Sequence, residues 1–191
     1  MIDLHMHSYY SDDGEFSPEN LVRQCAQKGI TLMSITDHNS VKANKEARRA
    51  AGALGIEYTA GVEVDCTYAG FNFHLLGYGI DENDPAFAKI EEDIRIQEKA
   101  ASRVKLQKTR EMGFEIEEAQ LEALALKTHW PESWTGEQFA QVLLDMPAYK
   151  DHPLLMPYRE GGERSVNPLV NFYWVFMPRA SPASRMCIFH C

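Results

Sequence analysis

The chain has 191 residues, 45% of them hydrophobic and 25% charged, and a formal net charge of −9. This length suits one domain, or one domain with an insertion, and the composition is that of an ordinary globular protein. The negative charge argues against a groove for long nucleic acid, where a stripe of Lys and Arg is expected. A small phosphorylated substrate remains compatible, because bound cations can reverse the local charge.

The sequence carries no signal for a membrane or for export. It has no run of about 18 apolar residues and no basic segment followed by an apolar one at its start, so we expect a cytoplasmic protein without a membrane partner. The cysteines do not have the paired spacing of a structural zinc site, and in this compartment they are expected to be reduced. They are Cys25, Cys66, Cys187 and Cys191.

The first third of the chain alternates between short apolar segments and helical patterns. Strand, helix and strand with short connections are typical of parallel βα units, in which functional groups gather at the carboxyl ends of the strands. The expected elements are a strand in Met1–Gly14, a helix from Ser17 to Lys28 ending at Gly29, a strand Ile30–Thr36, a helix capped by Asn39 or Ser40 and running to Leu54, and strands Ile56–Val64 and Phe71–Tyr78.

The pattern changes after Asn83. A single apolar stripe predicts one helix from Pro85 to about Met112, which at ~1.5 Å per residue is too long for a simple βα crossover. We therefore expect a helical insertion, with further helices at Ile116–Lys127 and Gly136–Leu144. The expected division is residues 1–82 for the first part, 83–174 for the insertion and return segment, and 175–191 for a tail with two arginines and no acid.

Two histidines, His5 and His7, lie on either side of Met6 near the start of the chain. Side chains on a strand alternate with a period of two, so both imidazoles would face the same side. Asp12 and Asp13 follow just beyond the expected strand end. Two imidazoles and a carboxylate are ligands for zinc and similar divalent metals. The alternative is a pair of partly exposed histidines on an edge strand.

Three further candidates lie at or near the ends of later strands. His38 follows Asp37, and its alternative role is that of a residue in a helix-capping loop. Glu63 lies between two valines, where burial of a carboxylate is costly unless it is paired or bound to metal. His74 by itself is more typical of a core histidine. Their common position favours a metal site, with Asp37 expected to orient a histidine rather than bind metal.

These segments resemble a known family. The runs DLHMHSYYSDDG, SITDHNS, AGVEVD and FHLLGY are similar, in order and spacing, to the PHP (polymerase and histidinol phosphatase) superfamily of metal-dependent phosphoesterases. The resemblance implies an α/β fold, the N-terminal portion of a distorted (β/α)7 barrel with an α-helical insertion. It also implies two or three zinc, manganese or iron ions bridged by Glu63. The HxHxxxxD spacing fits Asp12 better than Asp13, although the doubled aspartate leaves both open. The implied metal ligands are His5, His7, Asp12, His38, Glu63 and His74.

The resemblance also implies a reaction, in which a metal-bridging hydroxide attacks phosphorus with Glu63 and Asp37 in the catalytic centre. The segments Thr135–Leu144 and Arg164–Trp174 are similar to standalone members with a helical insertion, whose relatives hydrolyse phosphate from 3′,5′-bisphosphates or trim the 5′ ends of short oligonucleotides. Thr135 is a candidate substrate contact. The alternatives are a non-catalytic PHP-like interaction module, a histidinol-phosphate phosphatase and a polymerase-associated exonuclease.

The chain departs from the family pattern after Trp174. Members of the family carry a His-Pro-Gly strand end and a final Asp-x-His pair that complete the metal site, and this sequence contains neither. His152-Pro153 is followed by leucine, and His190 has no aspartate two residues before it. The sequence therefore predicts a truncated or frameshifted C-terminal part and low activity for this chain.

Overall fold

The structure is a computed structural model that describes residues 1–68, 71–126, 128–149 and 151–156. The described chain divides into two compact units, residues 1–94 and a second unit from Arg95 onward. The boundary lies inside helix α3 (Pro85–Glu111), the long helix that the sequence predicts. Gly113, which follows the end of this helix, has a φ of 91°. The tail expected at residues 175–191 lies outside the described residues.

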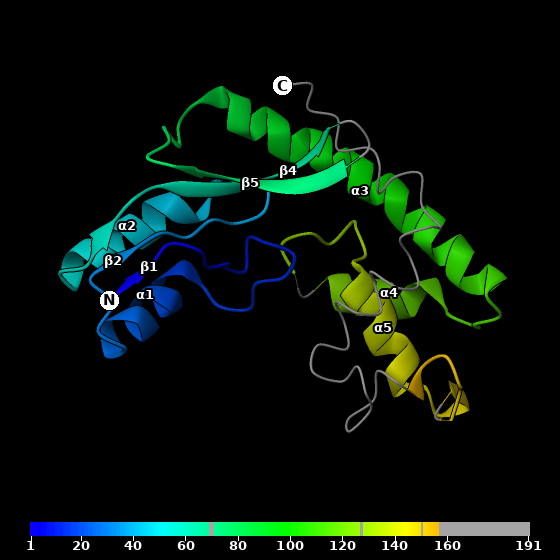
Figure 1. The fold of residues 1–191 in the computed structure, drawn as a ribbon. Helices are drawn as coiled ribbons and strands as arrows, with labels where there is room; N and C mark the ends of the chain where they lie inside the picture. Colours follow the sequence, from blue (N-terminus) through cyan, green and yellow to red (C-terminus); the bar gives the residue numbers. More distant parts are fainter. Residues whose placement is uncertain (69–70, 127, 150, 157–191) are drawn as a thin grey trace. The chain divides into compact units, whose positions relative to one another are not determined.

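The first unit is built on a parallel sheet (Figure 1). Strands β1 (Ile2–Asp3), β2 (Leu32–Met33) and β3 (Glu57–Tyr58) pair in the order β1-β2-β3. Helices α1 (Pro18–Gln27) and α2 (Ala43–Ala53) connect them and pack against each other. The predicted βα alternation is therefore confirmed, although each paired strand segment is only two residues long.

Local sequence explains where α1 begins and ends. Ser17 Oγ accepts a hydrogen bond from Asn20 N, and Pro18 occupies the first turn, where a missing N–H costs nothing. Gly29 follows the helix at a φ of 72°, which favours glycine. The expected start of α2 is wrong, because Lys42 is the N-cap residue and its side chain makes no cap hydrogen bond.

The last two strands of this unit form an antiparallel pair rather than another parallel βα unit. Strand β4 (Gly61–Tyr68) pairs along its whole length with β5 (Phe71–Tyr78). The single strand expected at Ile56–Val64 is thus divided between β3 and β4. Asn44 stabilises this break, because its side chain accepts a hydrogen bond from Gly61 N and donates one to Gly61 O.

Small residues bring α2 close to the sheet. Ala43, Ala47 and Ala51 recur every four residues, so they lie on one face of the helix, and each is at most 1% exposed. The free thiol of Cys25 is buried in the same core. The core of the first unit consists of Val22, Cys25, Ile30, Met33, Ile35, Ala43, Ala47, Ala51 and Ile56.

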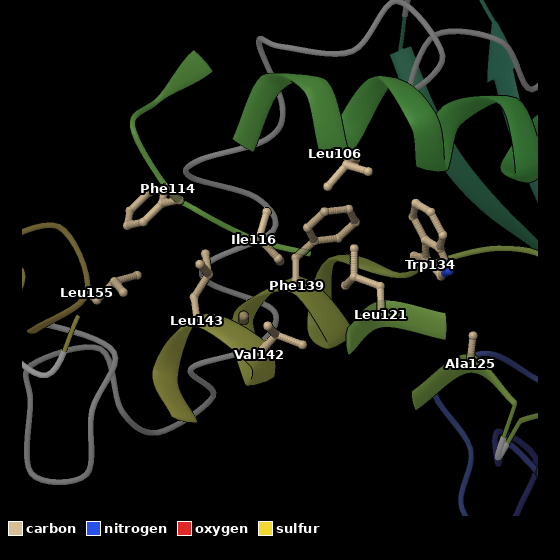
Figure 2. Packing of buried hydrophobic residues seen from close by; sticks show 11 residues of the cluster. Leu106, Phe114, Ile116, Leu121, Ala125, Trp134, Phe139, Val142, Leu143 and Leu155 are labelled. Carbon is tan, nitrogen blue, oxygen red and sulfur yellow. The ribbon is translucent and has the colours of Figure 1, made fainter. Parts of the chain in front are cut away.

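The second unit is helical, as the sequence predicts. Beyond its part of α3 it contains α4 (Glu118–Ala125), α5 (Gly136–Asp145) and a short 3-10 helix. Figure 2 shows its core, in which side chains from α3, α4, α5 and the segments that connect them lie around Phe139. None of the helices in the described residues is long and apolar enough to cross a membrane.

Candidate metal centre

His5 and His7 lie in the extended segment after β1 and both reach the same carboxylate. The Nε2 atom of His5 is 2.8 Å from Glu63 Oε2, and the Nε2 atom of His7 is 3.2 Å from the same oxygen. The two imidazole centroids are 5.1 Å apart. The segment is not a paired strand at these positions, yet its extended geometry turns both side chains toward Glu63.

A loop from Ser8 to Gly14 brings a second carboxylate to His7. Ser11 N donates to Ser8 O, and Ser11 Oγ donates to Asp13 Oδ1 at 2.7 Å, which turns the chain back on itself. As a result Asp13 Oδ1 lies 3.2 Å from His7 Nδ1. Asp13, one residue beyond the expected Asp12, is thus the aspartate among the grouped donors, and both aspartates are exposed.

The loop after β2 runs alongside β4 and places His38 beside Glu63. Glu63 N donates to Asp37 O at 3.1 Å and Asn39 N donates to Glu63 O at 2.7 Å, so His38 and Glu63 form a parallel bridge. The Nε2 atom of His38 faces Asp13 Oδ2 at 3.7 Å and Glu63 Oε2 at 3.9 Å. These backbone hydrogen bonds position His38, which lies in the loop between β2 and α2.

The antiparallel pair supplies the other side of the cluster. Residues on β4 alternate between two faces, so Glu63 and Asp65 lie on the same face, and His74 on β5 is the direct cross-strand partner of Asp65. His74 Nδ1 is 2.7 Å from Glu63 Oε1, and His38 Nδ1 is 2.9 Å from Asp65 Oδ1. Sequence reasoning missed Asp65, although its spacing of two from Glu63 was the available signal.

Glu63 is the centre of this arrangement. Its side chain is 3% exposed, its Oε2 atom faces His5 and His7, and its Oε1 atom faces His74. A carboxylate with two oxygens directed at separate imidazole sets suits a ligand shared by two cations. Among the described residues there are three overlapping groups, and within each group the donor atoms lie within 4.8 Å of one another. They are His5–His7–Glu63, His7–Asp13–His38 and His38–Asp65–His74.

The donor set fits the implied metals. Imidazole nitrogens and carboxylate oxygens together suit zinc, manganese and iron, and no thiol is among the grouped donors. Without a cation these groups compensate one another. Burial opposes protonation of His38, but the hydrogen bond and the negative charge of Asp65 outweigh the effect of burial and raise the pKa of His38 to about 10. Burial likewise opposes ionisation of Asp13, while His7 and Ser11 keep its pKa well below the usual range.

Asp37, which is expected to orient a histidine, contacts the residue that follows His7. It is 1% exposed, and its two oxygens accept hydrogen bonds from Ser8 N at 2.5 Å and Ser8 Oγ at 2.7 Å. Burial raises the pKa of Asp37 to about 6, against the opposing effect of these hydrogen bonds. Since Ser8 follows His7, Asp37 can influence the orientation of that histidine through the main chain.

Thr135, the expected substrate contact, belongs to the second unit. Its hydroxyl accepts a hydrogen bond from Gln138 N, and the Gln138 side chain accepts one from Thr135 N, which makes it the N-cap of α5. This capping box gives the residue a structural role. Its contact with substrate stays a prediction.

A Ser8→Ala substitution is expected to destabilise the first unit by about 1–3 kcal/mol, because one oxygen of buried Asp37 loses its donor. Urea unfolding measures the effect. Ser34→Ala is the matched control: Ser34 is also fully buried, but its hydroxyl has no hydrogen-bond partner among the described residues. Equal losses in the two variants would show that the Ser8–Asp37 hydrogen bond contributes nothing.

In the metal-free protein, stability is expected to fall as the pH rises from about 6.5 to about 10. Folded His38 binds its proton more tightly than the unfolded residue, so its contribution is complete below pH 6.5 and is lost as the pH passes through 10. Chelator-treated protein unfolded in urea at a series of pH values tests this expectation. A His38→Gln variant should show a shallower slope over this range, and an unchanged slope would contradict the assignment.

A family model matches the part of the chain that carries this cluster. The PHP domain model aligns with residues 3–150, which include all the grouped donors. The chain belongs to the PHP family. Its mixed α/β fold with a parallel sheet agrees with that membership.

Three curated relatives of this PHP chain carry names that describe phosphoester chemistry. It is 33% identical over 156 residues to the 3′,5′-nucleoside bisphosphate phosphatase of Chromobacterium violaceum, covering 78% of this chain and 51% of that protein. It is 34% identical over 117 residues to a 5′-3′ exoribonuclease of Haemophilus influenzae, covering 61% and 40%. It is 32% identical over 117 residues to a phosphoribosyl 1,2-cyclic phosphate 1,2-diphosphodiesterase of Eggerthella lenta, covering 60% and 44%. The chain thus spans about half the length of these relatives, or somewhat less.

Solved structures show the same fold. An amidohydrolase from Chromobacterium violaceum with bound sulfate aligns with a TM-score of 0.56 and 30% identity over 89% of the PHP chain and 63% of that protein. A Bifidobacterium adolescentis structure described as a metal-dependent phosphoesterase aligns with a TM-score of 0.62 over 78% and 51% of the two chains. At 20% identity the second likeness concerns the fold alone.

Proposed function

We propose that this PHP chain is a metal-dependent phosphoesterase whose cluster binds two or three zinc, manganese or iron ions. The observation that carries the proposal is the buried Glu63 carboxylate, whose two oxygens face separate sets of imidazoles. A carboxylate in this position would bridge two cations. The proposed ligands are His5, His7, His38, Glu63 and His74, with the aspartate ligand supplied by Asp13 or Asp12.

The residues of the cluster and around it would hold the cations and the loop that carries His7. Bound divalent ions would supply Lewis acidity toward phosphate oxygens and make a water molecule acidic enough to attack phosphorus at neutral pH. Glu63 would keep two cations at a fixed separation, and the bonds from Ser8 to Asp37 would keep the His7 loop in place. The side chains of Glu63 and Asp37 are held by packing, because both are almost fully buried.

Small nucleotides are the proposed substrates, either a 3′,5′-nucleoside bisphosphate or the 5′ end of a short oligonucleotide. The names of the Chromobacterium violaceum and Haemophilus influenzae relatives support these two classes. The net charge of −9 agrees with a substrate smaller than long nucleic acid. Thr135 would contact the substrate, and the cytoplasm is the proposed compartment.

The proposed architecture of the whole domain is a distorted (β/α)7 barrel, with residues 1–82 as its N-terminal half and 83–174 as a helical insertion and return segment. The parallel order β1-β2-β3 and the family match support it. Because neither a His-Pro-Gly nor a late Asp-x-His motif follows Trp174 in residues 1–191, we expect this polypeptide alone to turn over substrate slowly.

The experiment measures hydrolysis of adenosine 3′,5′-bisphosphate by the 191-residue protein in the presence of Mn²⁺, with release of inorganic phosphate as the readout. Slow turnover that stops with chelator and in His7→Ala, but persists in His129→Ala, supports the proposal. His129 is an exposed histidine of the second unit and serves as the matched control. Metal-independent turnover, or equal turnover in wild type and His7→Ala, would refute it and favour a non-catalytic module.

A further inference from the structure

Asp65 lies on β4 two residues after Glu63, and both of its carboxylate oxygens accept hydrogen bonds. Oδ1 lies 2.9 Å from His38 Nδ1, and Oδ2 accepts a hydrogen bond from Asn39 Nδ2 at 2.8 Å. The Asp65 side chain is partly buried. The carboxylate thus lies behind the imidazole, on the side opposite to Nε2.

Asn39 fixes this carboxylate from two directions. Its Oδ1 atom accepts a hydrogen bond from Asp65 N at 3.0 Å while its Nδ2 atom donates to the Asp65 side chain. Asn39 is 3% exposed and has a φ of 55°, a left-handed conformation that asparagine adopts more readily than most residues. The strained backbone is consistent with a side chain required at this position.

The two ring nitrogens of His38 have different surroundings. Nδ1 faces the Asp65 carboxylate, whereas Nε2 faces Asp13 and Glu63. When Nδ1–H donates to a carboxylate, Nε2 carries the lone pair that a cation can bind, and the ring becomes a stronger donor. We propose that Asp65 is a positioning residue that keeps His38 in the Nδ1–H form, with Nε2 toward the metal, and that Asn39 fixes Asp65 in this role.

The contrasting possibility is that Asp65 itself binds a cation together with His38 and His74. His74 Nε2 is 3.6 Å from Asp65 Oδ1. However, each oxygen of Asp65 is already within hydrogen-bond distance of a donor on His38 or Asn39, whereas the oxygens of Glu63 face imidazoles alone in the interactions described above. This difference favours a positioning role for Asp65 and a ligand role for Glu63.

The proposal rests on the proposed metal binding but not on phosphatase activity, so its test uses binding and spectroscopy. Co²⁺ is titrated into wild type, Asp65→Ala, Asp65→Asn and the control Asp145→Ala, which removes an exposed carboxylate on α5. We expect Asp65→Ala to lower Co²⁺ affinity about 10- to 100-fold and to change the visible spectrum without changing the number of ions bound. Asp65→Asn, which keeps an oxygen acceptor, should recover part of the loss.

A second readout follows the His38 ring itself. In the Zn²⁺-loaded wild type, ¹⁵N NMR should show Nε2 bound to metal and a protected Nδ1–H, and the protection should be lost in Asp65→Ala. Asn39→Gly keeps the left-handed backbone accessible but removes the bond to Asp65. Its loss of affinity should be smaller and should disappear in the Asp65→Ala background, because the two residues would act in series.

Three results would overturn the proposal. A loss of one bound Co²⁺ in Asp65→Ala, with unchanged affinity for the others, would make Asp65 a ligand. Unchanged affinity and spectrum in that variant, or additive losses with Asn39→Gly, would remove the positioning role. If the wild type and Asp145→Ala both bind no Co²⁺ or Zn²⁺, the proposed function itself is refuted, and the wild-type titration distinguishes this outcome from a failure of the positioning role alone.

Discussion

A Glu63→Gln variant is expected to bind at least one divalent ion fewer than wild type and to lose about 100-fold or more of any phosphatase activity. The amide keeps the size of the side chain, so the packing around this buried position changes little. It replaces one anionic oxygen by an NH₂ group, which cannot bind a cation and which faces either the His5 and His7 side or the His74 side. The bridge between the two imidazole sets is therefore broken.

Metal analysis after equilibrium with Mn²⁺ measures this effect, and Glu57→Gln is its control. Glu57 is an exposed carboxylate on β3, in the same unit and outside the cluster. The control should bind as much Mn²⁺ as wild type. Wild-type Mn²⁺ content in Glu63→Gln would show that Glu63 is not a bridging ligand.

A Gly14→Ala variant is expected to lose both stability and metal affinity. A Cβ atom at this position would lie 2.0 Å from Ser8 O and 2.9 Å from His7 C. These are backbone atoms that no rotamer change can move, so the loop between His7 and Gly14 must shift. Such overpacking costs about 1–3 kcal/mol, and the displaced loop would carry Asp13 and His7 away from their partners. We expect Mn²⁺ affinity to fall about tenfold or more.

Gly52→Ala in α2 is the matched control, because nothing lies within 4 Å of its added Cβ atom. Alanine is the better helix former, so this variant should gain about 0.5–1 kcal/mol in urea unfolding and leave Mn²⁺ affinity unchanged. Opposite signs of the two stability changes are the expected result. If Gly14→Ala has the same stability in urea and the same Mn²⁺ affinity as wild type, the close packing of this loop is not required.

The sequence carried enough information to find most of the cluster because its donors interrupt or follow apolar segments, although Glu63 and His74 lie within strands β4 and β5 rather than at their ends. His38, Glu63 and His74 each lie in an apolar segment or immediately after one, where a polar side chain needs a partner. The structure brings them together with His5 and His7. Helix α1 was equally predictable, since Ser17, Pro18 and Gly29 act locally and need no tertiary contact.

What the sequence could not provide depends on contacts between distant segments. The position of Asp13 depends on Ser11, whose hydroxyl donates a hydrogen bond to Asp13 beside His7. The antiparallel pairing of β4 with β5, by contrast, is a local feature, because only two residues separate Tyr68 from Phe71 and so short a connection joins antiparallel strands. Asp65 could have been found from its spacing of two from Glu63, and the pairing places it opposite His74.

The pattern at the start of α2 was misread for a similar reason. Asn39 and Ser40 are good helix caps by type, but Asn39 is used for the backbone and side chain of Asp65 instead. The helix therefore begins later, at Ala43. Asn39 could either cap a helix or hydrogen-bond to Asp65, and the local sequence does not show which of the two it does.

The most direct test of the central claim is electron paramagnetic resonance of the protein loaded with Mn²⁺ to equilibrium, with the bound metal counted on the same sample. Two cations sharing the Glu63 carboxylate should give at least two Mn²⁺ per chain and an exchange-coupled spectrum, which becomes that of isolated Mn²⁺ in Glu63→Gln. Wild-type protein that binds no Mn²⁺, or only isolated ions with the same spectrum as Glu63→Gln, would contradict the claim.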